Sequence, residues 1–307
     1  MLKKRVNRLF LLGVSFLILV IWSLLLVGLL ENKLIDFKKK KDVWASYRHP
    51  QMPIVLPDKK KQVKGIMAKA FLLIDSKTNT ILNEKNKKLR IFPASTTKLI
   101  SALTALNIYP LNEVVEIKER YDNGKVMELE IGEKIKVEDL VKALLVYSAN
   151  DAAFNLAKHH PRGINGFVSE MNGILRKYKL KDSRFTNFDG LHNQEHYSTI
   201  YDLSQIARLA IKNKIVKQTV KIKDIKIVSL TGQEHQLENT NELLRKIPEV
   251  KGLKTGWTPE AGGCFIALFN INGHELISVV AQSDDRFGDT EKILNWAKEN
   301  VSWEEYR

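Results

Sequence analysis

The sequence of 307 residues contains a single cysteine, Cys264. One cysteine cannot form an intrachain disulfide, and it cannot supply a cysteine cluster for a structural metal ion. Cys264 stands in an apolar run typical of a strand, where a free cysteine acts as a small buried hydrophobic residue. The sequence therefore excludes a disulfide-stapled fold and a cysteine-based metal centre.

Recognition signatures for nucleic acids are also missing, although the chain is basic. It has 49 lysines and arginines against 35 aspartates and glutamates, a formal net charge of +14. Such an excess suits contact with a polyanion or with an anionic membrane surface. No zinc-finger, homeodomain or RNA-binding signature accompanies it. Charge alone does not choose the partner, but without a signature we expect no nucleic acid partner.

A long uncharged run near the N-terminus predicts a membrane anchor. Residues 9–30 are 22 apolar or uncharged residues in succession, long enough to span a bilayer as a helix. The run ends without an Ala-x-Ala cleavage site, which favours an uncleaved anchor over a secretory signal peptide. Residues 1–8 are then expected in the cytoplasm. Lysines on both sides of the run give opposing signals for orientation. We place the large domain outside the membrane because long domains translocate largely regardless of charge.

Residues 31–65 read as a basic tether. They hold the four-lysine run at 38–41, Pro53 and Pro57, and they show little apolar periodicity. A solvated spacer is one interpretation of the lysine run, and contact with anionic lipid headgroups is the other.

From residue 66 the pattern is typical of a globular domain. Apolar or alternating runs predict strands, and apolar residues at three- and four-residue spacing predict helices. Strands are expected at 70–75, 81–82, 114–117, 128–131, 220–230, 263–270 and 275–282, and helices at 95–107, 137–146, 150–158, 164–178, 201–211 and 290–301. Because strands bracket a helical middle, we predict an α+β fold whose sheet is built from both ends of the chain.

Ser95 and Lys98 open one of these predicted helices, just after Pro93. Residues three apart share a helix face, so the Lys98 amine can reach the Ser95 hydroxyl. A serine attacks a carbonyl when a neighbouring base takes its proton, and burial or nearby positive charge lowers the pKa of a lysine enough for that task. The helix N-terminus also favours an oxyanion. The plain alternative is that Ser95 only caps the helix.

Two further motifs can complete such a site. Ser148 and Asn150 fall between two predicted helices, where both side chains can point into one cleft. Lys254, Thr255 and Gly256 precede a predicted strand; the first two suit a carboxylate, and the glycine lets a peptide approach the backbone closely. Alone, the first pair reads equally as a helix cap and the second motif as an ordinary turn.

The order Ser-x-x-Lys, Ser-x-Asn, Lys-Thr-Gly is that of penicillin-binding proteins and class A β-lactamases. The longer segments resemble the low-molecular-mass penicillin-binding proteins, the serine D-alanyl-D-alanine carboxypeptidases. The segments that carry the resemblance are 93–98, 148–153, 189–191, 197–199, 239–241 and 252–262. The resemblance covers about residues 68–297. It implies the transpeptidase fold shared by these proteins and β-lactamases, an antiparallel sheet flanked by helices with a helical subdomain, so residues 66–307 are expected to form the catalytic domain.

The resemblance also implies roles for the motif residues. Ser95 is expected to be the acylated nucleophile, Lys98 its general base, and Ser148 a proton relay to the leaving amine. Asn150 is expected to hydrogen-bond the peptide of the substrate. In the third motif, Lys254 supports the local field, Thr255 holds the terminal carboxylate, and Gly256 lies against the substrate. The backbone N–H groups of Ser95 and Trp257 form the oxyanion hole.

The reaction that this resemblance implies is removal of the last D-alanine from a peptidoglycan stem peptide ending in D-Ala-D-Ala. An acyl-enzyme forms and is hydrolysed, β-lactams trap the same serine, and neither a metal nor a cofactor is needed. Many relatives add a C-terminal β domain with an amphipathic membrane helix. This chain ends at Arg307, so we expect the N-terminal run to be its anchor.

Alternatives remain at this point. An endopeptidase that cuts crosslinks, or a β-lactamase, can use the same motifs, and a penicillin-binding wall scaffold without activity is a third possibility. No Glu-x-x-Leu-Asn occurs between Asn150 and Lys254, which argues against a class A β-lactamase. Some relatives place a carboxylate-binding arginine near the start of the last helix. Arg286 is the one candidate here, and the sequence does not fix its alignment.

Overall fold

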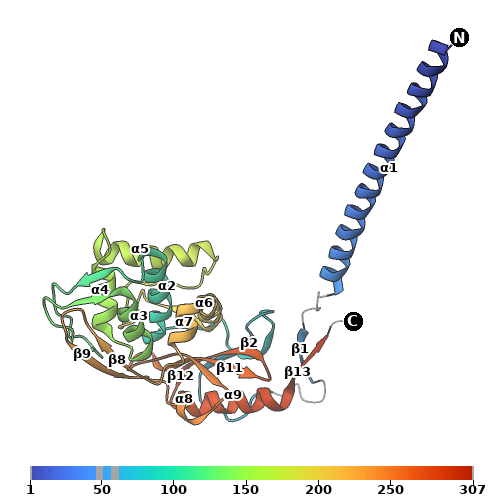
Figure 1. The fold of residues 1–307 in the computed structure, drawn as a ribbon. Coiled ribbons are helices and arrows are strands. Elements are labelled where there is room, and N and C mark those ends of the chain that lie inside the picture. Colours follow the sequence, from blue (N-terminus) through green and yellow to red (C-terminus); the bar gives the residue numbers. More distant parts are fainter. Residues whose placement is uncertain (1, 46–50, 57–61, 306–307) are drawn as a thin grey trace. The chain divides into compact units, whose positions relative to one another are not determined.

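The structure is a computed structural model that describes residues 2–45, 51–56 and 62–305. It contains two compact units, one made of Met1–Met52 with Glu304–Arg307 and the other of Pro53–Trp303. The first unit is dominated by helix α1, Leu2–Ala45 (Figure 1). The first half of the predicted tether is therefore helical. The short strands β1, Gln51–Val55, and β13, Val301–Glu305, pair with each other.

The predicted membrane span at residues 9–30 falls on α1. The side chains of residues 2–16 and of residue 18 lie outside the described residues. In the part of the chain whose side chains are described, no helix is long and apolar enough to cross a membrane. The large apolar side chains described between Leu17 and Leu30 are exposed.

A five-stranded sheet forms the centre of the second unit. Its strands, all antiparallel, lie in the order β10, β11, β12, β2, β3. Their bounds are β2 Ala70–Asp75, β3 Ile81–Lys85, β10 Val250–Thr258, β11 Gly262–Ile271 and β12 His274–Ser283. Strands from the two ends of the domain thus meet at the β12–β2 pair, which confirms the predicted α+β fold.

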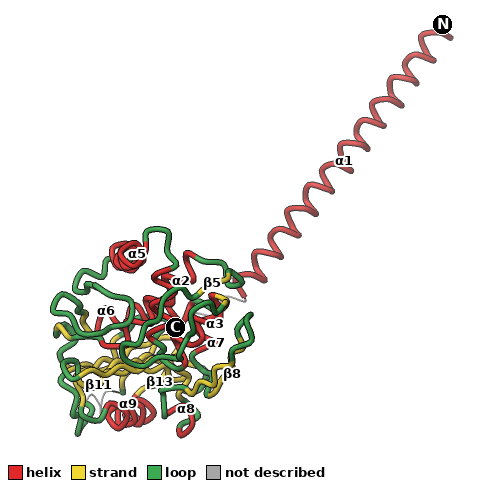
Figure 2. The backbone as a smooth tube through the Cα atoms, turned by 90° about the vertical axis from the view of Figure 1, so that its left-hand side faces the viewer, coloured by secondary structure: helices red, strands yellow, loops and turns green. Residues whose placement is uncertain are grey.

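Both faces of this sheet are covered. Successive residues of β2 enter different cores, Phe71 and Leu73 on one face and Leu72 and Ile74 on the other. Because each face is buried, β2, β11 and β12 read as continuous apolar runs, and this is why the sequence predicted these three well. Strand β10 was not predicted, because its polar Lys254 and Thr255 interrupt the apolar pattern, and Lys254 to Gly256 lie within it instead of before a strand. Figure 2 places α9 on one side of the sheet and α2, α5 and α6 on the other.

The remaining elements surround the sheet. The helices are η2 Ala94–Thr97, α2 Lys98–Ile108, α3 Val137–Val146, α4 Asn150–Lys158, α5 Gly163–Lys177, α6 Ile200–Lys212, α7 Lys214–Thr219, α8 Leu243–Lys246 and α9 Arg286–Asn300. Three two-stranded sheets pair β4 Arg90–Ile91 with β7 Ser198–Thr199, β5 Val114–Glu116 with β6 Lys134–Lys136, and β8 Asp224–Val228 with β9 Glu234–Glu238. Helices α2 to α7 form the predicted helical part.

Two strand predictions need correction. Residues 128–131 are a loop, because the backbone N–H groups of Met127 and Leu129 donate to the Asp151 carboxylate instead of to a neighbouring strand. Of the strand expected at 220–230, only β8 forms, because Val220 still belongs to the C-terminal end of α7.

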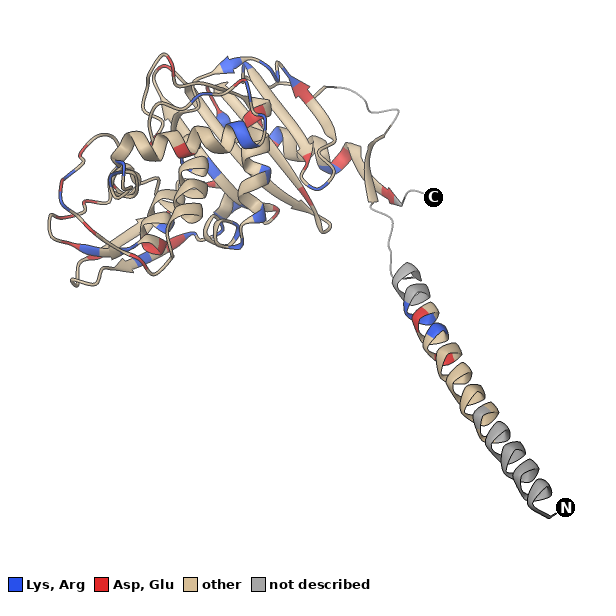
Figure 3. Cartoon of the chain, turned by 90° about the horizontal axis from the view of Figure 1, so that it is seen from above, with Lys and Arg blue, Asp and Glu red and all other residues tan. Residues whose placement is uncertain are grey.

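The positive charge is concentrated in the N-terminal segment. Residues 1–65 hold 14 lysines and arginines against 4 acidic residues, whereas residues 66–307 hold 35 against 31. Residues 66–307 thus carry a formal charge of only +4. Figure 3 shows basic and acidic residues interspersed over that unit.

Candidate active site

Ser95 lies in the 3-10 turn η2, one turn before α2 begins at Lys98. The helix start was predicted, and the structure adds the tighter turn. Ala94, just before the serine, has a φ of 46°. Gly190 packs against its carbonyl, and a Cβ at position 190 would lie 1.9 Å from the Ala94 oxygen. Position 190 therefore has to be glycine for the nucleophile turn to keep this geometry.

The Lys98 amine is fully buried and lies among three oxygen atoms. Its Nζ is 3.0 Å from Ser95 Oγ, 2.5 Å from Asn150 Oδ1 and 2.9 Å from the Asp189 carbonyl oxygen. The amide and carbonyl oxygens can only accept hydrogen bonds. A neutral amine has two N–H groups and one lone pair, so it can donate to both and accept from Ser95 Oγ–H. This arrangement is the one that a lysine acting as base requires.

Burial lowers the pKa of Lys98 from 10.5 to about 8. The carboxylates of Asp189 and Asp151 oppose this shift because they favour the ammonium form. The resulting value is close to neutral pH, as expected for a general base.

The second motif stands at the junction of α3 and α4. Ser148 is buried there with a φ of 69°, and Asn150 begins α4. Besides its contact with Lys98, Asn150 donates from Nδ2 to the Asn123 carbonyl at 2.8 Å and from its backbone N–H to the Lys125 carbonyl at 2.7 Å. The loop before β6 therefore holds Asn150 in place.

The third motif lies on β10, the edge strand of the sheet. Lys254 is 1% exposed, and its Nζ donates to the Thr255 carbonyl at 3.1 Å. Burial lowers the pKa of Lys254 well below 10.5, and the nearby cations Lys98, Lys125 and Arg286 lower it further. The electrostatics of this strand therefore favour an anion.

Gly256 lies directly beside the nucleophile turn. A Cβ at this position would lie 2.9 Å from the backbone nitrogen of Ser95 and 3.1 Å from that of Thr96. A larger residue here would thus obstruct the Ser95 N–H, one of the two predicted oxyanion donors. The neighbouring Trp257 is 60% exposed at the rim.

The structure also resolves the position of Arg286. It is the first residue of α9, and its Nη1 donates to the Gly256 carbonyl at 3.4 Å. Its buried Nε has no hydrogen-bond partner in the described part of the chain. The sequence left the alignment of this arginine open, and the fold brings it to the Lys-Thr-Gly strand.

Sequence reasoning assigned no role to several residues that complete the site. Thr240 Oγ1 lies 2.7 Å from Thr255 Oγ1, so two hydroxyls stand together at the predicted carboxylate position. Asp189 contributes its backbone carbonyl, and its side chain accepts a hydrogen bond of 2.6 Å from the Tyr121 hydroxyl. The segments 189–191 and 239–241 had been singled out only by resemblance.

His196 supports the same loop. Burial lowers the pKa of His196 to about 3, so the ring is neutral. Its Nδ1 accepts from the Thr186 N–H at 3.1 Å, which leaves the proton on Nε2 to be donated to Thr97 Oγ1 at 2.9 Å. The histidine therefore joins the loop that supplies the Asp189 carbonyl to the turn that carries Ser95.

Within residues 2–45, 51–56 and 62–305, no cluster of histidine, cysteine and acidic side chains is arranged to hold a metal ion. The convergent groups of the cleft are instead a serine, two buried lysines, an arginine and two threonines. This set combines a nucleophile and a base with a cationic wall, which suits acyl transfer from a substrate that bears a carboxylate.

Comparison with known proteins agrees with this geometry. The profile of the D-alanyl-D-alanine carboxypeptidase family matches residues 58–285. The D-alanyl-D-alanine carboxypeptidase DacF of Bacillus subtilis is 29% identical over 240 residues, covering 75% of this chain and 62% of the relative. A D-alanyl-D-alanine endopeptidase of Pseudomonas aeruginosa is 29% identical over 235 residues, covering 73% of this chain and 75% of that protein.

The fold also has solved counterparts. The crystal structure of the Streptomyces K15 DD-transpeptidase superposes with a TM-score of 0.72 at 30% identity, covering 77% of this chain and 98% of that one. The chain spans less than two thirds of the length of the Bacillus carboxypeptidase. From the matched profile and the geometry of the cleft, the chain belongs to the D-alanyl-D-alanine carboxypeptidase family.

Proposed function

We propose that the protein is a serine D-alanyl-D-alanine carboxypeptidase that removes the terminal D-alanine from peptidoglycan stem peptides. The observation that carries this proposal is the buried Lys98 amine. It has two acceptor oxygens for its N–H groups, and its third contact, at 3.0 Å, is the Ser95 hydroxyl. Lysine is thereby placed to take the proton of the serine as the serine attacks.

In the first step Ser95 Oγ attacks the carbonyl carbon of the penultimate D-alanine, and its proton passes to Lys98 Nζ. The carbonyl oxygen becomes an oxyanion, which the N–H groups of Ser95 and Trp257 stabilise; each such donor contributes roughly 3 kcal/mol in the transition state. The C–N bond then breaks, and the departing amine receives the proton that Lys98 took from Ser95. By family resemblance Ser148 relays that proton.

The second step returns the enzyme to its starting state. A water molecule attacks the acyl-enzyme and gives a proton to the Lys98 amine. The ester bond to Ser95 then breaks, and Lys98 returns that proton to Ser95 Oγ. The products are the shortened peptide and the free serine. Every proton in this sequence moves between oxygen or nitrogen atoms of the substrate, water and the described side chains, so no redox partner is required.

The terminal carboxylate identifies the correct substrate end. We assign it to the hydroxyls of Thr255 and Thr240, 2.7 Å apart, within the positive field of Lys254 and Arg286. An endopeptidase must accept a leaving group larger than free D-alanine. The endopeptidase named among the relatives keeps that second activity open for this chain.

The experiment combines labelling with turnover. Fluorescent penicillin added to the purified protein should modify Ser95, identified by mass spectrometry, and a peptide ending in D-Ala-D-Ala should release free D-alanine. The Ser95→Ala variant should do neither. Labelling of Ser95 without D-alanine release from any stem peptide favours the inactive scaffold. Release of peptide from cross-linked dimers alone favours the endopeptidase, and rapid hydrolysis of penicillin favours a β-lactamase.

We further propose that residues 9–30 anchor the protein in the cell membrane, with the catalytic domain on the extracytoplasmic side. The supporting features are the 22 uncharged residues and the formal charge of +10 in residues 1–65, which suits an anionic lipid surface. Fractionation of cells that express the whole chain tests this, because an anchored protein stays with the membrane in carbonate buffer. Recovery in the soluble fraction would reject the anchor.

A further inference from the structure

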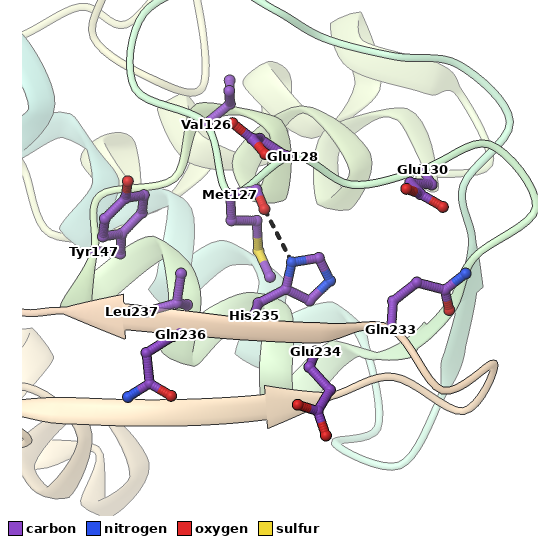
Figure 4. A pocket seen from close by; sticks show the side chains of 10 residues that line it. All are labelled: Val126, Met127, Glu128, Glu130, Tyr147, Gln233, Glu234, His235, Gln236 and Leu237. Carbon is purple, nitrogen blue, oxygen red and sulfur yellow. Dashed lines mark hydrogen bonds between the residues drawn. The ribbon is translucent and has the colours of Figure 1, made fainter.

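A pocket of about 450 Å³ lies beside the catalytic motifs and takes no part in the chemistry described above. It is bounded by the loop 126–130 on one side and by β9 on the other (Figure 4). Tyr147 stands at one end, and Gln233 and Glu130 stand at the other. The lining residues are Val126, Met127, Glu128, Glu130, Tyr147 and residues 233–237. Its volume is in the range of pockets that hold ligands.

The strand that borders this pocket has an unpaired edge. The N–H groups of Asn239 and Ser229 donate to the carbonyls of Lys223 and Gln233, so the odd-numbered residues of β9 bond to β8. The backbone groups of the even-numbered residues therefore point away from β8. Across the described residues, no hydrogen bond is made by the backbone of Glu234, Gln236 or Glu238 on that edge.

The free edge faces the pocket, and the His235 side chain of the same strand reaches across to the loop, where its Nδ1 donates to the Met127 carbonyl at 2.9 Å (Figure 4). Thr240 continues the even-numbered row, and its N–H donates to the Val146 carbonyl at 3.1 Å, next to Tyr147. The row of Glu234, Gln236 and Glu238 hence lies on the side of Tyr147. An extended peptide can pair with such an edge by strand addition.

Both walls of the pocket connect along the chain to residues of the candidate active site. On β9, Gln236 precedes Thr240 by four residues, about 13 Å at 3.3 Å per residue, and Thr240 touches Thr255 at the predicted carboxylate position. On the loop, Val126 follows Lys125, whose carbonyl accepts from the Asn150 N–H. A chain lying in the pocket would therefore extend toward the reacting bond.

The charge around the pocket selects among peptides. Glu128, Glu130 and Glu234 border it, and no lysine or arginine lines it. Glu234 forms an ion pair with Lys226 at 2.7 Å, whereas Glu128 and Glu130 form no ion pair with any described residue. A peptide with a free amine is the complementary occupant.

We propose that this pocket binds a second stem peptide of the peptidoglycan, as an extended strand paired with β9 and with its free amine beside Glu128 and Glu130. Stem peptides fit because they are short chains that contain a diamino residue. The inference rests on the proposed function, and it adds that the preferred substrate is a cross-linked or closely neighbouring pair of stems.

The test compares two probes and two variants of the full chain. One probe is diacetyl-L-lysyl-D-alanyl-D-alanine, which has no free amine and no second strand. The other is a cross-linked peptide dimer that ends in D-Ala-D-Ala and keeps one free amine. Gln236→Pro removes the outward N–H without removing a β8–β9 hydrogen bond, and proline is tolerated at such an edge. Gln236→Ala keeps the N–H and is the matched control.

We expect Gln236→Pro to lower kcat/KM for the dimer at least tenfold and for the short probe less than twofold. Gln236→Ala should leave the ratio of the two values near that of the wild type. Equal effects on both probes, or an unchanged ratio in Gln236→Pro, overturn the proposal. Penicillin labelling of Ser95 at the wild-type rate checks that the proline variant is folded.

A second measurement tests the proposal if the Gln236→Pro variant does not fold. The double variant Glu128→Gln, Glu130→Gln changes only exposed side chains, and it should weaken binding of a fluorescent dimer at least fivefold at low salt. Cadaverine, a simple diamine, should not compete with the dimer. If cadaverine displaces the dimer as well as unlabelled dimer does, the site is only an acidic patch, and pairing of the peptide with β9 is rejected. If the wild type releases no D-alanine from either probe, the proposed function fails, while dimer binding still decides the pocket.

Discussion

The two walls of the cleft each carry a buried lysine, and they use it differently. On the helical wall, Lys98 Nζ lies among three oxygens, one of which belongs to Ser95. On the strand wall, Lys254 Nζ donates to the carbonyl of the next residue, its one hydrogen bond among the described residues. Both side chains are removed from water. In the proposed mechanism, this difference in partners suits Lys98 to move a proton and Lys254 to set the field for an anion.

The neighbours of each lysine reinforce this division. Two carboxylates, Asp189 and Asp151, raise the pKa of Lys98 against the effect of burial and hold it near 8. Among the described residues, the charges that shift the pKa of Lys254 are those of Lys98, Lys125 and Arg286, and all three lower it in addition to burial. A bound carboxylate from the substrate would relieve that repulsion. The strand wall therefore gains a compensating negative charge only when the substrate binds, whereas the contacts of Lys98 on the helical wall are present without substrate.

The largest expected effect comes from replacing Lys98 on the helical wall. Lys98→Met keeps most of the side-chain volume but removes the base, so the rate of Ser95 acylation should fall about 10³-fold or more, with D-alanine release falling in parallel. The measurement is the rate of labelling by fluorescent penicillin. A variant that turns over at the wild-type rate would disprove the role of Lys98, even within the correct family.

Replacing Lys254 on the strand wall by methionine should reduce activity less than Lys98→Met does. We expect kcat/KM for a peptide with a free terminal carboxylate to fall about 100-fold, because the anion loses its main cation. The same peptide with its carboxylate amidated should lose far less. Lys98→Met should impair both peptides equally. If Lys254→Met also impairs both equally, the two lysines do not differ in role.

Thr255→Val tests how the strand wall binds the terminal carboxylate of the substrate. It removes a hydroxyl and keeps the shape, so acylation should slow about tenfold for ~1.4 kcal/mol lost. Thr240→Val should have a similar effect. Because the two hydroxyls touch, the double variant should lose less than the product of the single losses. Independent effects in this cycle would mean that the two threonines do not bind one group.

The smallest effect is the pH dependence of the wild type. Only the neutral amine accepts a proton, and a pKa of about 8 leaves roughly a tenth of Lys98 neutral at pH 7 and half at pH 8. The rate of acylation should therefore rise about fivefold over this interval and level off above pH 9. A rate that falls as the pH rises from 7 to 8 would show that the ammonium form is the active one.

Much of this site was readable from the sequence because its side chains come from short motifs. Ser95 and Lys98 lie three residues apart at a helix start, and local geometry brings their side chains within 3.0 Å. Ser148 with Asn150 and Lys254 with Thr255 are likewise close in sequence. The fold then joins the motifs, and the contact between Lys98 and Asn150 spans 52 positions. Which roles the individual side chains take remains a prediction from the resemblance.

The remaining site residues could not be predicted from the sequence, because their contacts depend on backbone groups or on partners distant in the sequence. Asp189 contacts Lys98 through its backbone carbonyl. Every residue type has this group, so the residue type does not reveal the contact. Thr240 matters only because β9 ends beside β10. The strand expected at 128–131 was wrong for a related reason. Its alternating pattern is real, with Met127 and Leu129 buried, but the Asp151 carboxylate takes the N–H groups that a neighbouring strand would need.

The fully buried Lys98 also bears on the stability of the fold. A shift of its pKa from 10.5 to about 8 corresponds to about 3 kcal/mol of folding free energy, which opposes folding wherever the amine is protonated. Between pH 8 and 10.5 the unfolded chain binds this proton more tightly, so stability should rise with pH across that window. Lys98→Met, though inactive, should then unfold at a temperature several degrees higher than the wild type at pH 7. In the proposed mechanism, the amine that activates Ser95 should therefore also lower the melting temperature of the domain that holds it.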